Sequence, residues 1–165
     1  MYPEILYVMT EDLLEICQNS GLKLALAESC TGGLIAGCIT SVAGSSAVFE
    51  RGFVTYTNAA KTDMLGVPAE LFDEVGAVSE QVAVHMAEGA LHHSDANVSL
   101  SVTGIAGPGG ATPDKPVGLV HIACARDGRL THHERHEFKG DRQRVRLQAV
   151  ESGLKLLLKC CAAID

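Results

Sequence analysis

The chain has 165 residues, of which 47% are apolar, and 13 Lys and Arg face 20 Asp and Glu, so its formal net charge is −7. This length predicts a single domain over residues 1–165, with a core that needs neither disulfides nor a structural metal. The acidic balance without a basic block excludes binding to a nucleic-acid backbone, and 4% aromatic residues with no Trp argue against base stacking.

The sequence predicts a cytoplasmic protein. Its first residues carry no basic stretch before an apolar segment, and no uncharged apolar run approaches the roughly 18 residues of a membrane span. The six cysteines form no C-x-x-C pair, which favours small buried thiols in a reducing compartment over disulfides. We therefore expect no membrane contact.

The first half of the chain predicts three helices and two strands, from apolar residues at helical spacing, short apolar runs and capping residues. In chain order they are a helix over 5–17, a strand over 23–27, a helix over 34–42, a strand over 53–56 and a helix capped by Asn58 that ends near Gly66. The first strand therefore leads through a turn with two glycines into the second helix.

The second half predicts two helices, three strands and one long loop. They are a helix over 79–93 capped by Ser79, a strand over 97–102, a loop over 103–118, strands over 117–125 and 130–138, and a helix from Asp141 to about Cys161. Eight of the sixteen loop residues are Gly or Pro, so no regular element persists there. The last two strands are joined through Asp127-Gly128, a pair typical of hairpins. Strands alternating with helices, with a late hairpin, indicate an α/β fold with a mixed sheet.

The turn from Glu28 to Gly33 is the first candidate site. Ligands of α/β sheets gather at the carboxyl ends of strands, and Ser29 occupies a strand-to-helix turn of the kind that carries nucleophilic serines. The backbone N–H groups of Thr31, Gly32 and Gly33 are candidate donors to an oxyanion or a phosphate. The same residues also fit a simple helix cap with glycines for close packing, and their spacing alone does not separate the two interpretations.

A nucleophilic Ser29 needs a base, because a free hydroxyl is almost never ionised at neutral pH. Lys61 lies one turn into the short helix from Asn58, where the helix dipole, and burial, would lower the pKa of its ammonium group. A neutral amine there could accept the hydroxyl proton, and Tyr56 could orient either group or relay a proton. Considered alone, Lys61 also fits a surface lysine on a short helix.

Two further clusters carry chargeable groups. Arg142 and Arg144 open the last predicted helix against its dipole, which favours a bound phosphate over local pairing with Asp141 and Glu137. A metal site within His132–His136 is conceivable, but a solvated strand explains these residues better. We expect neither a metal nor a cofactor.

Seven short segments spread over nearly the entire chain carry a family resemblance. They are Ala27–Gly33, Gly44–Ser46, Tyr56–Asn58 with Lys61, Leu65–Val67, Gly76–Ser79, Val102–Gly110 and Pro116–Gly118. Together they closely resemble the CinA C-terminal domain family, which implies a three-layer α/β/α fold with a mixed sheet. Members similar to a stand-alone domain are nicotinamide-nucleotide amidohydrolases, which convert nicotinamide mononucleotide to nicotinic acid mononucleotide and ammonia in pyridine nucleotide salvage.

The resemblance also implies the roles of individual residues. Ser29 would attack the carboxamide carbon, while Lys61, with Tyr56, would manage its proton and the departing ammonia. The substrate contacts would be backbone donors at Thr31, Gly32 and Gly33, walls of the nucleotide site at Thr103 and Gly104, and a phosphate ligand at Arg142 or Arg144.

Two other functions stay open on the sequence alone. One is a nucleotide-binding or regulatory module with the same pocket and no catalysis, and the other is a cysteine hydrolase that uses Cys30. The helix over 79–93 offers a candidate surface for a homo-oligomer, although its apolar stripe fits the core better. The residues themselves leave room for one small anion held by local groups, and the resemblance implies that the partner is a small-molecule nucleotide substrate.

Overall fold

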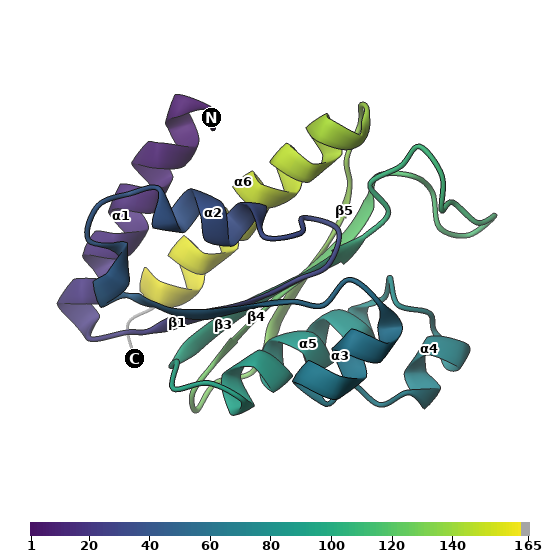
Figure 1. Cartoon of the computed structure of the whole chain (residues 1–165), viewed down its shortest axis with the longest axis horizontal. Helices are drawn as coiled ribbons and strands as arrows, with labels where there is room; N and C mark the ends of the chain where they lie inside the picture. Colours follow the sequence, from purple (N-terminus) through teal and green to yellow (C-terminus); the bar gives the residue numbers. More distant parts are fainter. Residues whose placement is uncertain (163–165) are drawn as a thin grey trace.

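Residues 1–162 are described by a computed structural model of the chain, in which a five-stranded sheet lies between two layers of helices (Figure 1). The strands are β1 (Leu24–Glu28), β2 (Phe49–Val54), β3 (Val98–Gly104), β4 (Leu119–Arg126) and β5 (His132–Glu137). Their order is β2-β1-β3-β4-β5, with β1 parallel to β2 and β3 and with both β4 pairings antiparallel. The predicted α/β class, three layers and mixed sheet are confirmed.

The helices divide between the two faces of this sheet. They are α1 (Glu4–Ser20), α2 (Leu34–Thr40), α3 (Asn58–Leu65), α4 (Glu70–Glu74), α5 (Glu80–His92) and α6 (Arg142–Ala162), with a short 3₁₀ turn, η1 (Ser45–Ala47). Helices α1, α2 and α6 cover one face, and α3, α4 and α5 lie on the other (Figure 1). None of these helices, within the part of the chain that is described, is long and apolar enough to cross a membrane.

Strand β1 is buried on both faces and fixes the direction of the residues that follow it. Leu24 and Leu26 pack in the core beneath α1, α2 and α6, whereas Ala25 and Ala27 pack against the opposite layer. Because side chains alternate along a strand, Glu28 continues the first direction and Ser29 the second. The end of β1 therefore presents one polar side chain to each layer.

Capping residues account for several helix ends. Ser79 accepts the N–H of Val82 at 3.3 Å, as predicted, and Asp141 caps α6 by accepting the N–H of Arg144 at 2.9 Å. The predicted cap at Asn58 is wrong by one residue. Thr57 is extended and accepts the N–H of Ala60 at 3.1 Å, so Asn58 is already helical.

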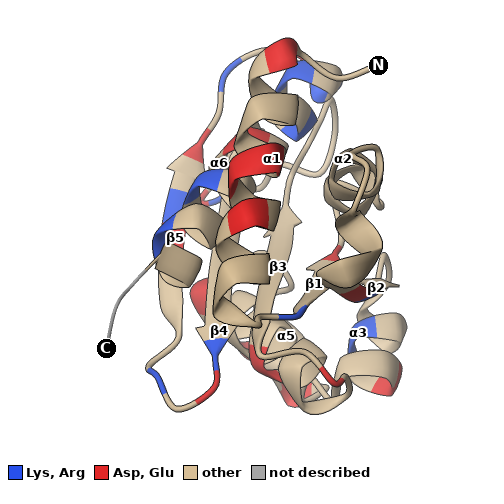
Figure 2. Cartoon of the chain, turned by 90° about the vertical axis from the view of Figure 1, so that its left-hand side faces the viewer, with Lys and Arg blue, Asp and Glu red and all other residues tan. Residues whose placement is uncertain are grey.

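Two other features differ from the sequence prediction. Strand β2 begins at Phe49 rather than Phe53, because its parallel pairing with β1 starts at Leu24 and ends at Glu28 opposite Val54. Helix α4 was not predicted, since five residues are too few to show a helical period. Figure 2 shows acidic residues along α1, and these side chains are exposed.

Candidate active site

Ser29 and Lys61 meet at the carboxyl end of β1. Ser29 directly follows the strand, and Lys61 comes from α3 on the same side of the sheet. Lys61 Nζ lies 3.1 Å from Ser29 Oγ and donates to the Thr55 carbonyl at 3.0 Å. Both side chains are buried, with Lys61 only 2% exposed. The sequence-predicted nucleophile and base are thus within direct hydrogen-bonding distance.

The environment of Lys61 favours its neutral form. Burial lowers the pKa of the Lys61 ammonium group, because the charged form loses its water. No carboxylate among residues 1–162 pairs with it, and its nearest acceptors are a hydroxyl and a carbonyl. An amine in this setting can take up a proton from Ser29.

Glu28 caps α2 from inside the protein. Its carboxylate accepts the N–H groups of Gly33 and Ile35 on Oε2, at 3.0 and 3.1 Å, and that of Ala36 on Oε1 at 2.8 Å. Glu28 is itself buried. The positive end of the α2 dipole is therefore already occupied by an internal anion.

Two of the three N–H groups predicted for the oxyanion site are already used within the fold. Gly33 N–H donates to Glu28, and Gly32 N–H donates to the Ser29 carbonyl at 3.0 Å, so the prediction that these two groups face a substrate is wrong. Both glycines have positive φ angles, 58° and 97°, which explains why glycine is needed there. Thr31 N–H has no acceptor among the described residues, and its expected role stays a prediction.

Tyr56 is paired with Arg142 rather than with the nucleophile or its base. Arg142 Nη2 donates to the Tyr56 hydroxyl and Arg142 Nη1 to the Gly107 carbonyl, each at 2.8 Å. No hydrogen bond joins Tyr56 to Ser29 or Lys61 in the described chain, and Tyr56 is 57% exposed. The structure gives no support to the expected proton relay through Tyr56, and it places this ring at the rim of the site.

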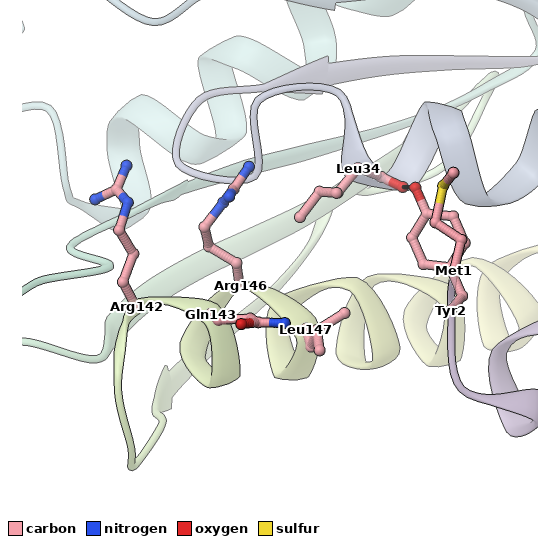
Figure 3. Close-up of a pocket in the computed structure, with 7 residues that line it drawn as sticks. All are labelled: Met1, Tyr2, Leu34, Arg142, Gln143, Arg146 and Leu147. Carbon is pink, nitrogen blue, oxygen red and sulfur yellow. Dashed lines mark hydrogen bonds between the residues drawn. The ribbon is translucent and has the colours of Figure 1, made fainter.

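Arg142 and Arg146 line one cavity of about 390 Å³ between α6, the start of α2 and the first residues of the chain. Both side chains extend from α6 toward the same side (Figure 3). Neither has a carboxylate partner within residues 1–162, and Arg144 is not among the lining residues. Of the two predicted phosphate ligands, the cavity therefore includes Arg142. Arg146 was missed, although its i, i+4 spacing from Arg142 placed both on one helix face.

Thr103 and Gly104 shape the neighbouring strand end. The Thr103 hydroxyl donates to the Ala77 carbonyl at 2.8 Å and is buried, so its side chain is already used within the fold. A Cβ on Gly104 would lie 2.7 Å from Val120 Cγ2 and 2.9 Å from the Leu119 carbonyl oxygen. Thr103 is thus held to the segment before α5 and Gly104 lies against β4, and their expected role as walls of the nucleotide site stays a prediction.

Cys30 is a poor nucleophile in this structure. Burial raises the pKa of the Cys30 thiol to about 12, so the reactive thiolate is disfavoured at neutral pH. Its thiol packs in the core under α1, α2 and α6, whereas Lys61 is hydrogen-bonded to Ser29 and Thr55. The arrangement therefore favours the serine over the cysteine.

Two of the histidines on β4 and β5 form a pair. His121 Nδ1 and His133 Nε2 are 2.8 Å apart with stacked rings, and His133 Nδ1 lies 3.6 Å from Glu80. Across residues 1–162, no set of three or more His, Cys, Asp or Glu side chains is placed to hold a metal ion. Within residues 1–162, neither histidine of this pair forms a hydrogen bond with Ser29 or Lys61.

Comparison with known proteins gives a consistent family match. Residues 7–161 match the model of the CinA C-terminal domain. The chain is 48% identical over 155 residues to nicotinamide-nucleotide amidohydrolase PncC of Enterobacter agglomerans, covering 93% of this chain and 94% of that protein. It is 57% identical over 138 residues to a CinA-like protein of Citrifermentans bemidjiense, covering 84% of this chain but only 33% of that longer relative.

Solved structures share the fold closely. The competence/damage inducible protein CihA of Agrobacterium tumefaciens has a TM-score of 0.95 at 47% identity, covering 96% of this chain and 97% of that one. The competence damage-inducible protein A of Klebsiella pneumoniae has a TM-score of 0.92 at 32% identity, covering 97% and 99%. The layers and sheet described above are therefore shared by crystallised relatives.

Proposed function

Because this chain belongs to the CinA C-terminal domain family, we propose that it hydrolyses the carboxamide of nicotinamide mononucleotide, with Ser29 as nucleophile and Lys61 as base. The observation that carries this proposal is the 3.1 Å distance between the buried Lys61 Nζ and Ser29 Oγ. The 48% identity to PncC of Enterobacter agglomerans, over nearly the full length of both chains, supports an amidohydrolase.

The first half of the reaction forms an acyl-enzyme. Neutral Lys61 takes the hydroxyl proton while Ser29 Oγ attacks the carboxamide carbon, which gives a tetrahedral intermediate with a negatively charged oxygen. Lys61 then returns the proton to the nitrogen as the C–N bond breaks. Ammonia leaves, and the nicotinoyl group stays bound to Ser29 as an ester.

The second half releases the acid. Lys61, neutral again, takes a proton from a water molecule that attacks the ester carbon. Collapse of the second tetrahedral intermediate breaks the bond to Ser29 Oγ, which regains the proton from Lys61. The product is nicotinic acid mononucleotide. One lysine therefore serves as base and acid in both halves of the reaction.

The phosphate of the nucleotide is assigned to Arg142. Its guanidinium donates only to a phenol and a carbonyl, at 2.8 Å each, so its charge is not neutralised by a carboxylate in the described chain. A phosphate is a better acceptor than either partner, because charge-assisted bonds to guanidinium are stronger. We place the reaction in cytoplasmic pyridine nucleotide salvage, a setting that suits the six free thiols.

Ammonia release from nicotinamide mononucleotide tests the proposal. The wild-type protein is expected to release ammonia, and Ser29→Ala and Lys61→Ala should each lower the turnover number by about a thousandfold or more. Circular dichroism should show an unchanged fold in both variants. Binding of the nucleotide by the wild type without any turnover would replace the proposal with a non-catalytic binding module.

A further inference from the structure

Arg146 joins α6 to the turn that carries the nucleophile. Its Nε donates to the Cys30 carbonyl at 3.1 Å, and its Nη2 donates to the Thr31 carbonyl at 2.9 Å. Figure 3 shows the side chain extending from α6 toward this turn. The guanidinium also packs against Gly32, where an added Cβ would lie 3.5 Å from Nη2. One side chain thus fixes two consecutive peptide groups next to Ser29.

These two hydrogen bonds determine where the N–H groups of the same two peptides, those of Thr31 and Gly32, point. In a planar trans peptide, the carbonyl and the N–H point in opposite directions. Because the Thr31 carbonyl points to α6, the N–H of Gly32 points away from α6, and it indeed donates to the Ser29 carbonyl at 3.0 Å. Because the Cys30 carbonyl also points to α6, the N–H of Thr31 points away from α6 in the same manner.

The side away from α6 is the side on which Lys61 lies. Helix α6 covers one face of the sheet and α3, which carries Lys61, lies on the other (Figure 1). Thr31 N–H has no acceptor within residues 1–162. The N–H groups of Gly33, Ile35 and Ala36, which would ordinarily make a helix start an anion site, are all occupied by Glu28.

We propose that Arg146 is a positioning residue, which holds the Thr31 N–H toward the oxygen that becomes negatively charged when Ser29 attacks. This inference rests on the proposed function. Arg146 acts from the far side of the turn and does not itself touch the substrate oxygen. Arg146 also polarises the peptide between Cys30 and Thr31, because it donates to the Cys30 carbonyl. This makes the Thr31 N–H a stronger hydrogen-bond donor.

A serine-reactive fluorophosphonate tests the inference without depending on the identity of the substrate. Ser29 Oγ forms a bond to phosphorus, fluoride leaves, Lys61 takes the proton, and negative charge develops on the phosphoryl oxygen. The labelling rate of Arg146→Met is expected to fall by about 10- to 100-fold, less than the loss on deleting a donor outright. Turnover of nicotinamide mononucleotide should fall in parallel, with KM and the melting temperature changed little.

Two further variants make the result decisive. Lys155→Met removes an exposed positive charge from the same helix and should leave the labelling rate unchanged. Arg146→Lys keeps the charge but can reach only one carbonyl, so it should recover part of the labelling rate. If Arg146→Met does not fold, Arg146→Lys takes its place in the test. Labelling of folded Arg146 variants at the wild-type rate would overturn the inference alone. A wild-type protein that is not labelled at Ser29 would overturn the proposed function together with it.

Discussion

Glu28 and Ser29 are adjacent in the chain, yet their side chains point to opposite faces of the sheet. The Glu28 carboxylate accepts three backbone N–H groups at the start of α2, whereas Ser29 Oγ meets Lys61 from α3. This follows from the alternation of side chains at the end of β1. The nucleophile is therefore anchored through its own neighbour, which ties the turn to α2.

Replacing the carboxylate at Glu28 is expected to destabilise the protein. In Glu28→Gln, one oxygen that accepts an N–H becomes an NH₂ group that cannot accept, so at least one backbone N–H at the start of α2 loses its partner. The free energy of unfolding should fall by about 1–3 kcal/mol, as measured by urea denaturation. Glu11→Gln, on the exposed face of α1, is the matched control and should have no effect. Equal stability of both variants would show that the cap contributes nothing.

Lys61 is expected to oppose stability while it supports activity. Burial lowers the pKa of its ammonium group in the folded state, so the unfolded chain binds the proton more tightly. The unfolding free energy of the wild type should therefore rise with pH between that lowered pKa and the ordinary lysine value of about 10.4. Lys61→Met should lack this rise and be at least as stable as the wild type near pH 7. A clear loss of stability in Lys61→Met would contradict this account.

The same pKa should appear in the pH dependence of catalysis. Because the neutral amine is the base, kcat/KM should increase with pH and level off above a pKa that lies below the ordinary lysine range. Lys61→Arg should stay inactive at every pH, since a guanidinium does not lose its proton in this range. A wild-type kcat/KM that is flat from pH 5 to 10 would exclude Lys61 as the base.

Local chemistry explains which features could be predicted from the sequence. The cap at Ser79 depends on a single residue with a strong preference, and this prediction was correct. The Ser29–Lys61 contact was expected from a strand end and a helix start, together with the family motifs. Strand β2 was misplaced because its limits are set by pairing with β1, which no local pattern reports.

The remaining errors concern backbone groups whose side-chain partners no sequence pattern identifies. Glu28 sits five to eight residues before the N–H groups that it caps, and this occupation removed Gly33 from the predicted donors. Arg146 contacts carbonyls that are 116 and 115 residues away in sequence. Sequence spacing can place such residues on a helix face or at a strand end, but it does not show which backbone groups they reach.

Acid is expected to destabilise the protein through His121. Burial, with His133 next in effect, lowers the pKa of His121 to about 4, whereas an unfolded histidine titrates near 6.5. As the pH falls from about 6.5 to about 4, the unfolded state takes up a proton that the folded state does not, so stability is lost. Chemical denaturation of His121→Phe across this range should show a shallower decline than the wild type. His132→Phe, an exposed position on β5, should keep the wild-type slope.

Thr55 lies beside the Ser29–Lys61 contact and carries a buried hydroxyl whose effect on stability can be tested. Its carbonyl accepts from Lys61, but its buried hydroxyl has no partner among the described residues. Thr55→Val keeps the shape and removes an unsatisfied polar group, so the melting temperature should stay the same or rise. By contrast, Thr10→Val removes a hydroxyl that donates to Leu6 at 2.7 Å and should lower it. A strongly destabilised Thr55→Val would show that this hydroxyl is bonded in solution.

Arg142 should distinguish a nucleotide from the corresponding nucleoside. Its guanidinium lines the cavity at the start of α6 without a carboxylate partner in residues 1–162, and a phosphate there would gain charge-assisted hydrogen bonds. Loss of one such bond, about 1.5–3 kcal/mol, corresponds to a KM for nicotinamide mononucleotide raised by roughly 10- to 100-fold in Arg142→Met. Activity on nicotinamide riboside, which has no phosphate, should change little in the same variant. Arg144→Met decides between the two arginines: a larger effect there than in Arg142→Met would move the phosphate to Arg144, and an equal loss on both substrates would remove Arg142 from phosphate binding.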